Sequence, residues 1–179
     1  MVYSNTIKIL SLSIASSTIF LVYLLGRKFF SQKYSLVVAT LFAFEPHLNY
    51  NSGFGLSEPL YHLAIIGAFY FIINKNTKFI IPSLLLVGAV WWIRFNGIIF
   101  LAVLLIIYFA TKRNSPNFYR NLFLAILIFL VLVSPMLSQR SDQFGDPFYF
   151  AYSQYIFTGS FDKTGSADGV LSLKAIVTF

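Results

Sequence analysis

The polar side chains best suited to chemistry gather in one segment of the chain, between residues 44 and 62. This segment holds both histidines and two of the six carboxylates. Its candidate site residues are Glu45, His47, Asn51, Glu58 and His62. A carboxylate in such a setting can bind a cation, a sugar hydroxyl group or, through a metal ion, a lipid phosphate. Glu58 is the leading functional candidate, and the other four residues form a candidate polar site around it.

The local sequence also gives Glu58 a purely structural interpretation. Ser57 can cap a helix that has Pro59 in its first turn, and Glu58 then lies beside the positive end of that helix. His62 follows one turn later on the same face, where it can bond to Glu58. Burial of an ionisable group at membrane depth costs about 2.5–3.5 kcal/mol, which favours a functional role. Both interpretations of the segment stand at this point.

Arg94 is a second candidate, because it ends an apolar run directly after Trp91 and Trp92. Its side chain can reach toward water from an interfacial position, or it can grip a phosphate or pair with Glu58. The two tryptophans are expected in an interfacial belt. The sequence contains no phosphate-binding P-loop, dinucleotide-binding glycine motif or nucleophile elbow. Two histidines and no cysteine also exclude a histidine-rich or thiolate metal site.

The elements that must position these residues are apolar runs. The chain is 58% hydrophobic and only 11% charged, against about a quarter charged in a soluble domain. This composition predicts an all-α, polytopic membrane helix bundle of about six transmembrane helices within residues 1–137. The helices are expected near 7–25, 35–51, 57–74, 79–93, 97–111 and 120–137. Pro135 should end the last helix, and residues 138–179 should form an outer-face loop or the start of an outer domain.

Charge distribution predicts the orientation of these helices. The connections 26–34, 74–78 and 111–121 contain eight lysines and arginines and no acid, whereas all six carboxylates fall on the other side. Short loops rich in Lys and Arg stay cytoplasmic. The expected localisation is therefore a multi-pass protein of a prokaryotic plasma membrane with Glu58 on the outer face. The net charge of +7 is explained by these loops and does not indicate nucleic-acid binding.

Two further expectations concern chain organisation. Residues 79–110 could form one long helix, but Asn96-Gly97 favours a turn, and a single helix would place Lys112 and Arg113 outside. A helical hairpin is therefore predicted. The chain is also expected to be a fragment of a longer protein. With residues 138–179 outside, an even number of crossings places Met1 outside as well, and an outer start of this kind needs an odd number of crossings upstream. Residues 171–179 also stop within what resembles a further element.

Several short motifs occur in a recognisable order. They are Tyr23–Phe30, Leu41–Pro46, Ser57–Leu60, Trp92–Gly97, and Arg140 with Phe144–Phe148. In this order they resemble the glycosyltransferase C superfamily, and more closely its integral-membrane branch of protein mannosyltransferases and aminoarabinose transferases. The resemblance covers nearly the whole chain.

The resemblance implies transfer of a sugar from a polyprenyl-phosphate-linked donor to a protein, lipid or glycan acceptor at the outer face of a lipid bilayer. It implies that Glu58 is catalytic and lies near the lipid phosphate or its metal, so that a divalent cation is a candidate cofactor. Arg94 and Arg140 would bind the donor phosphate. The principal catalytic acid of this family lies in a first outer loop that this chain lacks, which implies a catalytically incomplete piece.

Two alternatives remain open beside the transferase. A non-catalytic subunit of a membrane complex would need no catalytic loop. A transporter would need polar residues at mid-span, and the serines and threonine between Ser11 and Thr18 form the one such cluster. Hydroxyl groups at such positions more often serve close packing of helices.

Overall fold

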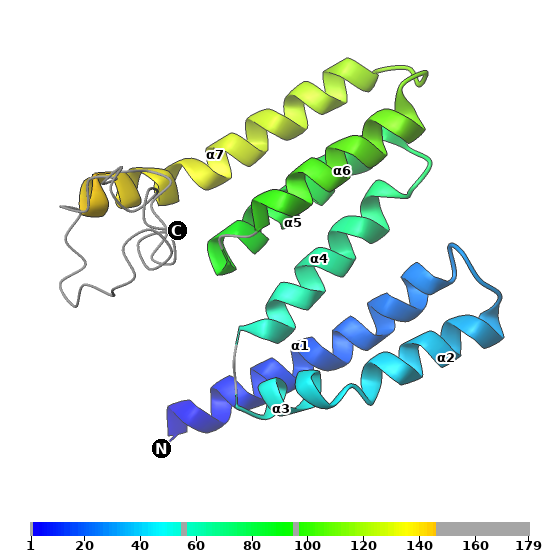
Figure 1. The fold of residues 1–179 in the computed structure, drawn as a ribbon, viewed down its shortest axis with the longest axis vertical. Helices are drawn as coiled ribbons and strands as arrows, with labels where there is room; N and C mark the ends of the chain where they lie inside the picture. The colour runs from blue at the N-terminus through cyan, green and yellow to red at the C-terminus, as the bar shows by residue number, and fades with distance from the viewer. Residues whose placement is uncertain (1, 55–56, 95–96, 146–179) are drawn as a thin grey trace, which may run out of the picture. The chain divides into compact units, whose positions relative to one another are not determined.

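The structure is a computed structural model that describes residues 2–54, 57–94 and 97–145. These residues form helices and no strand, which confirms the all-α prediction. In chain order the helices are α1 (Val2–Gly26), α2 (Gln32–Ala43), α3 (Pro46–Phe54), α4 (Glu58–Ile72), the short 3-10 helix η1 (Thr77–Phe79), α5 (Ile80–Ile93), α6 (Gly97–Lys112) and α7 (Phe118–Phe144) (Figure 1). The predicted tail after residue 145 lies outside the described residues.

The chain divides into two units, residues 1–132 and 133–179, and α7 runs from the first into the second. Within the first unit, α4 contacts α1 on one side and α5 on the other (Figure 1). Helix α1 also contacts α2 and α3, and α5 contacts α6. The described helices α1 to α6 therefore form a bundle in which α4 is the central element.

Small residues let α4 approach its neighbours closely. A Cβ atom built on Gly67 would lie 3.0 Å from Leu86 Cδ1 of α5 and 3.5 Å from Leu21 Cδ2 of α1. The hydroxyl of Ser83 on α5 donates to the carbonyl oxygen of Ala68 at 2.8 Å, so the contact also carries a buried hydrogen bond. Close backbone approach through small residues is the usual packing mode of membrane helices, where lipid removes the hydrophobic drive between helices.

Among the described residues, two helices are long and apolar enough to cross a membrane, namely Asn5–Gly26 and Phe118–Gln143. Glu58–Ile72, Thr77–Ile93 and Gly97–Lys112 are also apolar but shorter. Large apolar side chains are exposed on several helices, among them Ile9 on α1, Leu41 on α2, Ile106 on α6 and Phe123 on α7, each more than 60% exposed.

The single helix predicted near 35–51 is wrong. The structure has two helices there, because α2 ends at Ala43 and Pro46 begins α3. Proline lacks the N–H group that the first turn leaves unpaired, so it suits the first position of a helix and disfavours helical backbone in the residue before it. Gly53 lies inside α3.

The predicted helix end at Pro135 is also wrong. Helix α7 continues through Pro135 to Phe144, so residues 138–144 are helical rather than loop. An interior proline removes one backbone hydrogen bond and costs about 3 kcal/mol. A kinked continuation is nevertheless common in apolar helices, where neighbouring groups satisfy the freed carbonyl.

The predicted hairpin is present, since α5 and α6 are separate helices that contact each other. Gly97 makes the tight connection possible, because a Cβ atom there would lie 2.8 Å from the backbone nitrogen of Trp91. Trp91 itself is buried and stacks on Phe129 with ring centroids 5.8 Å apart, so it belongs to the core. Of the two tryptophans expected in an interfacial belt, only Trp92 is exposed, and its place in a belt stays a prediction.

The basic connections lie at one end of the first unit. The Nζ atom of Lys28, between α1 and α2, lies 5.1 Å from the ring centroid of Tyr70 near the end of α4. The amide of Asn121 on α7 donates to the hydroxyl of Thr77 on η1 at 2.8 Å, which joins the other two connections. The charge pattern thus predicted which connections share an end.

Candidate functional site

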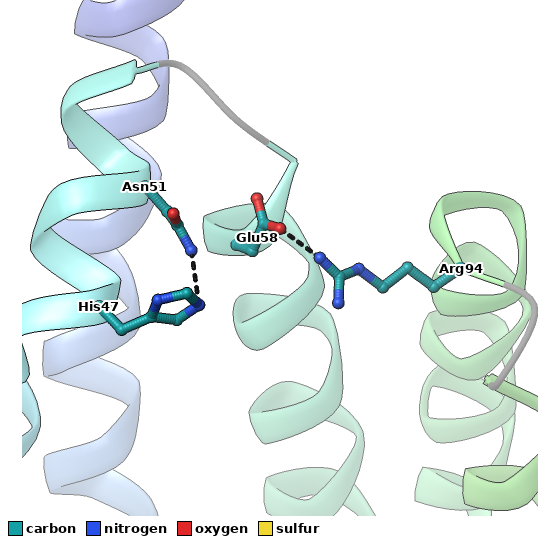
Figure 2. A network of polar contacts seen from close by, with 4 residues as sticks. All are labelled: His47, Asn51, Glu58 and Arg94. Carbon is teal, nitrogen blue, oxygen red and sulfur yellow. Dashed lines mark hydrogen bonds and ion pairs between the residues drawn. The ribbon is translucent and has the colours of Figure 1, made fainter.

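The site is centred on an ion pair between Glu58 and Arg94, at the opposite end of α4 from the basic connections (Figure 2). Glu58 is the first residue of α4, and Arg94 directly follows the last residue of α5. The contact between α4 and α5 brings these positions together, although 36 residues separate them in sequence. Guanidinium Nη2 contacts carboxylate Oε1, and the two side chains are 42% and 17% exposed. The sequence left open whether Arg94 reaches toward water, grips a phosphate or pairs with Glu58, and the structure shows the pairing.

Tyr61 supports this arginine and was missed by the sequence analysis. The guanidinium carbon of Arg94 lies 5.2 Å from the ring centroid of Tyr61. A cation over an aromatic face is attracted by the negative face of the ring. The available signal was the spacing, because Tyr61 follows Glu58 by three residues and therefore shares its helix face.

One oxygen of Glu58 and one nitrogen of His62 have no partner in the described part of the chain. Both Glu58 Oε2 and His62 Nδ1 are buried and form no hydrogen bond. The predicted bond between these two side chains is therefore absent. The His62 ring packs edge-on against Phe42 and Tyr61, with centroid separations of 6.4 and 5.8 Å. Buried polar atoms are nearly always satisfied, so two orphans on one helix face mark a place for an added polar group.

Ser57 has the predicted position at the start of α4 but not the predicted hydrogen bond. Ser57 is the residue before α4, with Pro59 in the first turn, but its side chain makes no capping hydrogen bond. Its backbone carbonyl accepts from Tyr61 N at 3.1 Å. The Ser57 hydroxyl thus does not occupy the N–H groups of the first turn, and Glu58 lies beside this helix N-terminus.

Glu45 caps α3. Its Oε2 atom accepts the backbone N–H of Leu48, in the first turn of that helix. This hydrogen bond is the main cause that lowers the pKa of Glu45. Desolvation raises the pKa, whereas a hydrogen bond from the backbone of His47 and the charges of His47 and His62 lower it further. The cap explains Glu45 without a ligand.

His47 and Asn51 form a second polar pair on α3, which faces the Glu58 end of α4 (Figure 2). Asn51 Nδ2 lies 3.0 Å from His47 Nε2, and Asn51 is 4% exposed. The two side chains lie one helical turn apart and within hydrogen-bond distance of each other. The predicted polar residues of α3 and α4 are thus brought to the same end of the bundle.

The same two helices, α4 and α5, line an apolar pocket to which neither Glu58 nor Arg94 contributes. It has a volume of about 370 Å³ and lies against α4, α5 and Leu132 of α7. Leu60, which lines the pocket, follows Glu58 by two residues in the sequence, and Ile93, which also lines it, directly precedes Arg94. The indole nitrogen of Trp92 donates to the carbonyl oxygen of Leu132 at 3.0 Å and so fixes one wall. The lining is entirely apolar, which suits a hydrocarbon chain and not a sugar.

Other predicted groups do not add to this site. In the part of the chain that the structure describes, no group of three or more His, Cys, Asp or Glu residues is arranged to hold a metal ion. Arg140 lies on α7 in the second unit, and its role at the donor phosphate stays a prediction. The hydroxyls of Ser13, Ser16 and Ser17 donate to the carbonyls four residues earlier in α1, so their hydrogen-bonding groups are satisfied within their own helix.

A comparison with protein-family models, curated proteins and solved structures finds no match to this chain. The interpretation of the site therefore depends on its own geometry and on the resemblance of its motifs.

Proposed function

We propose that the protein is an integral-membrane glycosyltransferase that moves a sugar from a polyprenyl-phosphate-linked donor to an acceptor hydroxyl group on the outer face of the membrane. The observation that supports the proposal is the Glu58–Arg94 pair at one end of α4 and α5, two helices that also line an entirely apolar pocket. A lipid-linked donor has the matching parts, because an anionic phosphate stands between a hydrocarbon chain and a polar sugar.

Each residue then has a defined task. Arg94 binds the donor phosphate, for which its planar fork of donors is suited, and its charge stabilises the phosphate as it leaves. Glu58 accepts the proton of the acceptor hydroxyl group. The acceptor oxygen forms a bond to the anomeric carbon while the bond from that carbon to the phosphate oxygen breaks, and the lipid phosphate departs with the electron pair. Attack from the face opposite the leaving group inverts the anomeric centre.

The surface and the charges of the bundle support the proposal that it is inserted in a membrane. Large apolar side chains face outward on α1, α2, α6 and α7, and lipid would cover them. We propose that the helices make about six crossings of a prokaryotic plasma membrane. The basic connections would lie inside and Glu58 outside, because short basic loops remain cytoplasmic.

Replacement of the proposed base tests this function. Glu58→Gln keeps the shape of the side chain and a hydrogen-bond acceptor for Arg94, but it removes the base. Transfer of labelled sugar, measured in membranes that contain the full-length protein and with a panel of polyprenyl-phosphate-linked hexoses and pentoses, should fall by about 10²–10⁴-fold from the rate without the substitution. Asp142→Asn, which removes one exposed carboxylate on α7, is the matched control and should keep the rate. Equal rates for both variants would exclude Glu58 from the reaction.

A further inference from the structure

The other end of the first unit carries an unbalanced group of cations. We define the basic end as the five basic residues of the connections around η1 and between α6 and α7, which are Lys75, Lys78, Lys112, Arg113 and Arg120. Residues 1–132 contain two acids, Glu45 and Glu58. Glu58 starts α4 and the basic end follows its last residue, so about 21 Å of helix separates them.

The basic end is a built structure and not a set of loose loops. The buried hydrogen bond from Asn121 Nδ2 to Thr77 Oγ1 joins η1 to α7. The hydroxyl of Tyr108 on α6 donates to the carbonyl oxygen of Phe118 at 3.2 Å, and the two rings stack with centroids 4.8 Å apart. These contacts fix the backbone from which the five cations project.

Lys112 is the most unusual of these cations. It is 8% exposed, and in the described residues no carboxylate pairs with it. Lys75 lies close enough for its positive charge to act on Lys112. Lys112 lies in the last turn of α6, where the free carbonyl groups favour a cation. An anion from outside the chain would complete the neutralisation of Lys112 and Lys75.

The start of α7 gives a second indication. Its first turn contains no acid, although the free N–H groups of a helix start favour negative charge. Arg120 lies in that turn instead, and Lys78 lies in η1, whose carbonyl groups accept the first N–H group of α5. The start of α7 and the five cations together create a strongly positive region, of the kind that binds phosphate.

Exposed rings border this region. Phe109 on α6 is 47% exposed, and Tyr119 and Phe123 on α7 are 77% and 68% exposed. Hydrocarbon beside phosphate-binding groups is the pattern that a phospholipid requires. We infer that the basic end binds the headgroup phosphate of an anionic phospholipid, with the acyl chains along α6 and α7. The inference does not depend on sugar transfer at the opposite end.

The test measures binding of a soluble short-chain lipid to the full chain in an uncharged detergent. Dihexanoyl phosphatidylglycerol should raise the unfolding temperature in a saturable way, and 0.5 M NaCl should weaken the effect by screening. The zwitterionic dihexanoyl phosphatidylcholine should have little effect. Inorganic phosphate at equal concentration should also have little effect, because it lacks acyl chains. A full shift with inorganic phosphate alone would identify a free-anion site and overturn the lipid assignment.

Variants locate the binding. Lys75→Gln combined with Lys112→Gln should raise the half-saturating concentration of phosphatidylglycerol by about tenfold or more, since each basic group contributes to attraction. Lys78→Gln combined with Arg120→Gln changes exposed side chains only, and it serves if loss of Lys112 prevents folding. Lys8→Gln, on the far part of α1, is the matched control. Equal titration curves for the control and the variants would refute the inference.

Discussion

Glu45 shows how one carboxylate can serve local structure within a polar cluster. Its hydrogen bond to Leu48 N holds its pKa below the usual value of 4.5. The folded state therefore binds the proton less tightly than the unfolded chain, so the cap stabilises α3 fully above pH 4.5. That stabilisation declines as the pH falls below 4.5, and it is lost once the pH has passed through the lowered pKa.

This sign predicts a pH-dependent helix end. Amide hydrogen exchange should show protection of the Leu48 N–H at neutral pH that decreases on acidification, after correction for the intrinsic exchange rate. In Glu45→Ala the protection should be low at all pH values, because the acceptor is gone. A Leu48 amide that stays equally protected in the variant would contradict the capping role.

The central pair shows what residue spacing alone can and cannot predict. The i,i+4 spacing of Glu58 and His62 suggested a bond that the structure lacks, because Glu58 Oε1 contacts Arg94 instead. Arg94 was considered as a partner because topology places both residues at the same ends of neighbouring helices. The contribution of Tyr61 needed the three-dimensional position of the guanidinium group, which no local spacing specifies.

At the scale of elements, the two prolines were the main source of error. The helix predicted near 35–51 is divided, with Pro46 at the start of α3, and Pro135, which was expected to end a helix, lies inside α7. A proline restricts backbone in the same way at a helix start and at an interruption. The difference comes from tertiary packing around each segment, which apolar runs do not reveal. The boundaries of α5 and α6, where Asn96-Gly97 marks the turn, were predicted well.

Two glycines allow the hairpin to be tested against a control. Gly97→Ala places a methyl group 2.8 Å from the backbone of Trp91, which cannot move aside as a side chain would. We expect a loss of stability of roughly 1–3 kcal/mol from this overpacking. Gly53→Ala lies in α3 with no atom within 4 Å of the added carbon, and it should raise stability by up to about 1 kcal/mol. Thermal unfolding in detergent measures both, and equal effects would contradict the close approach.

At the scale of the whole molecule, charge distribution was the strongest signal in the sequence. It predicted that the connection after α1 lies with the connection after α4, and the contact of Lys28 with Tyr70 confirms this. The pattern works because each apolar helix carries the chain from one end of the bundle to the other, so alternate connections share an end. Which end faces the cytoplasm depends on the membrane, and it stays a prediction.

That orientation can be measured directly because the chain contains no cysteine. Ser57→Cys and Lys75→Cys each introduce one exposed thiol, at opposite ends of α4. In intact cells a membrane-impermeant maleimide should label the Ser57 variant, and it should label the Lys75 variant only after the membrane is permeabilised. Short basic loops resist translocation, which is the physical reason for this expectation. Labelling of both variants from one side would mean that α4 does not cross the membrane, and the outward placement of the Glu58–Arg94 pair would fall with it.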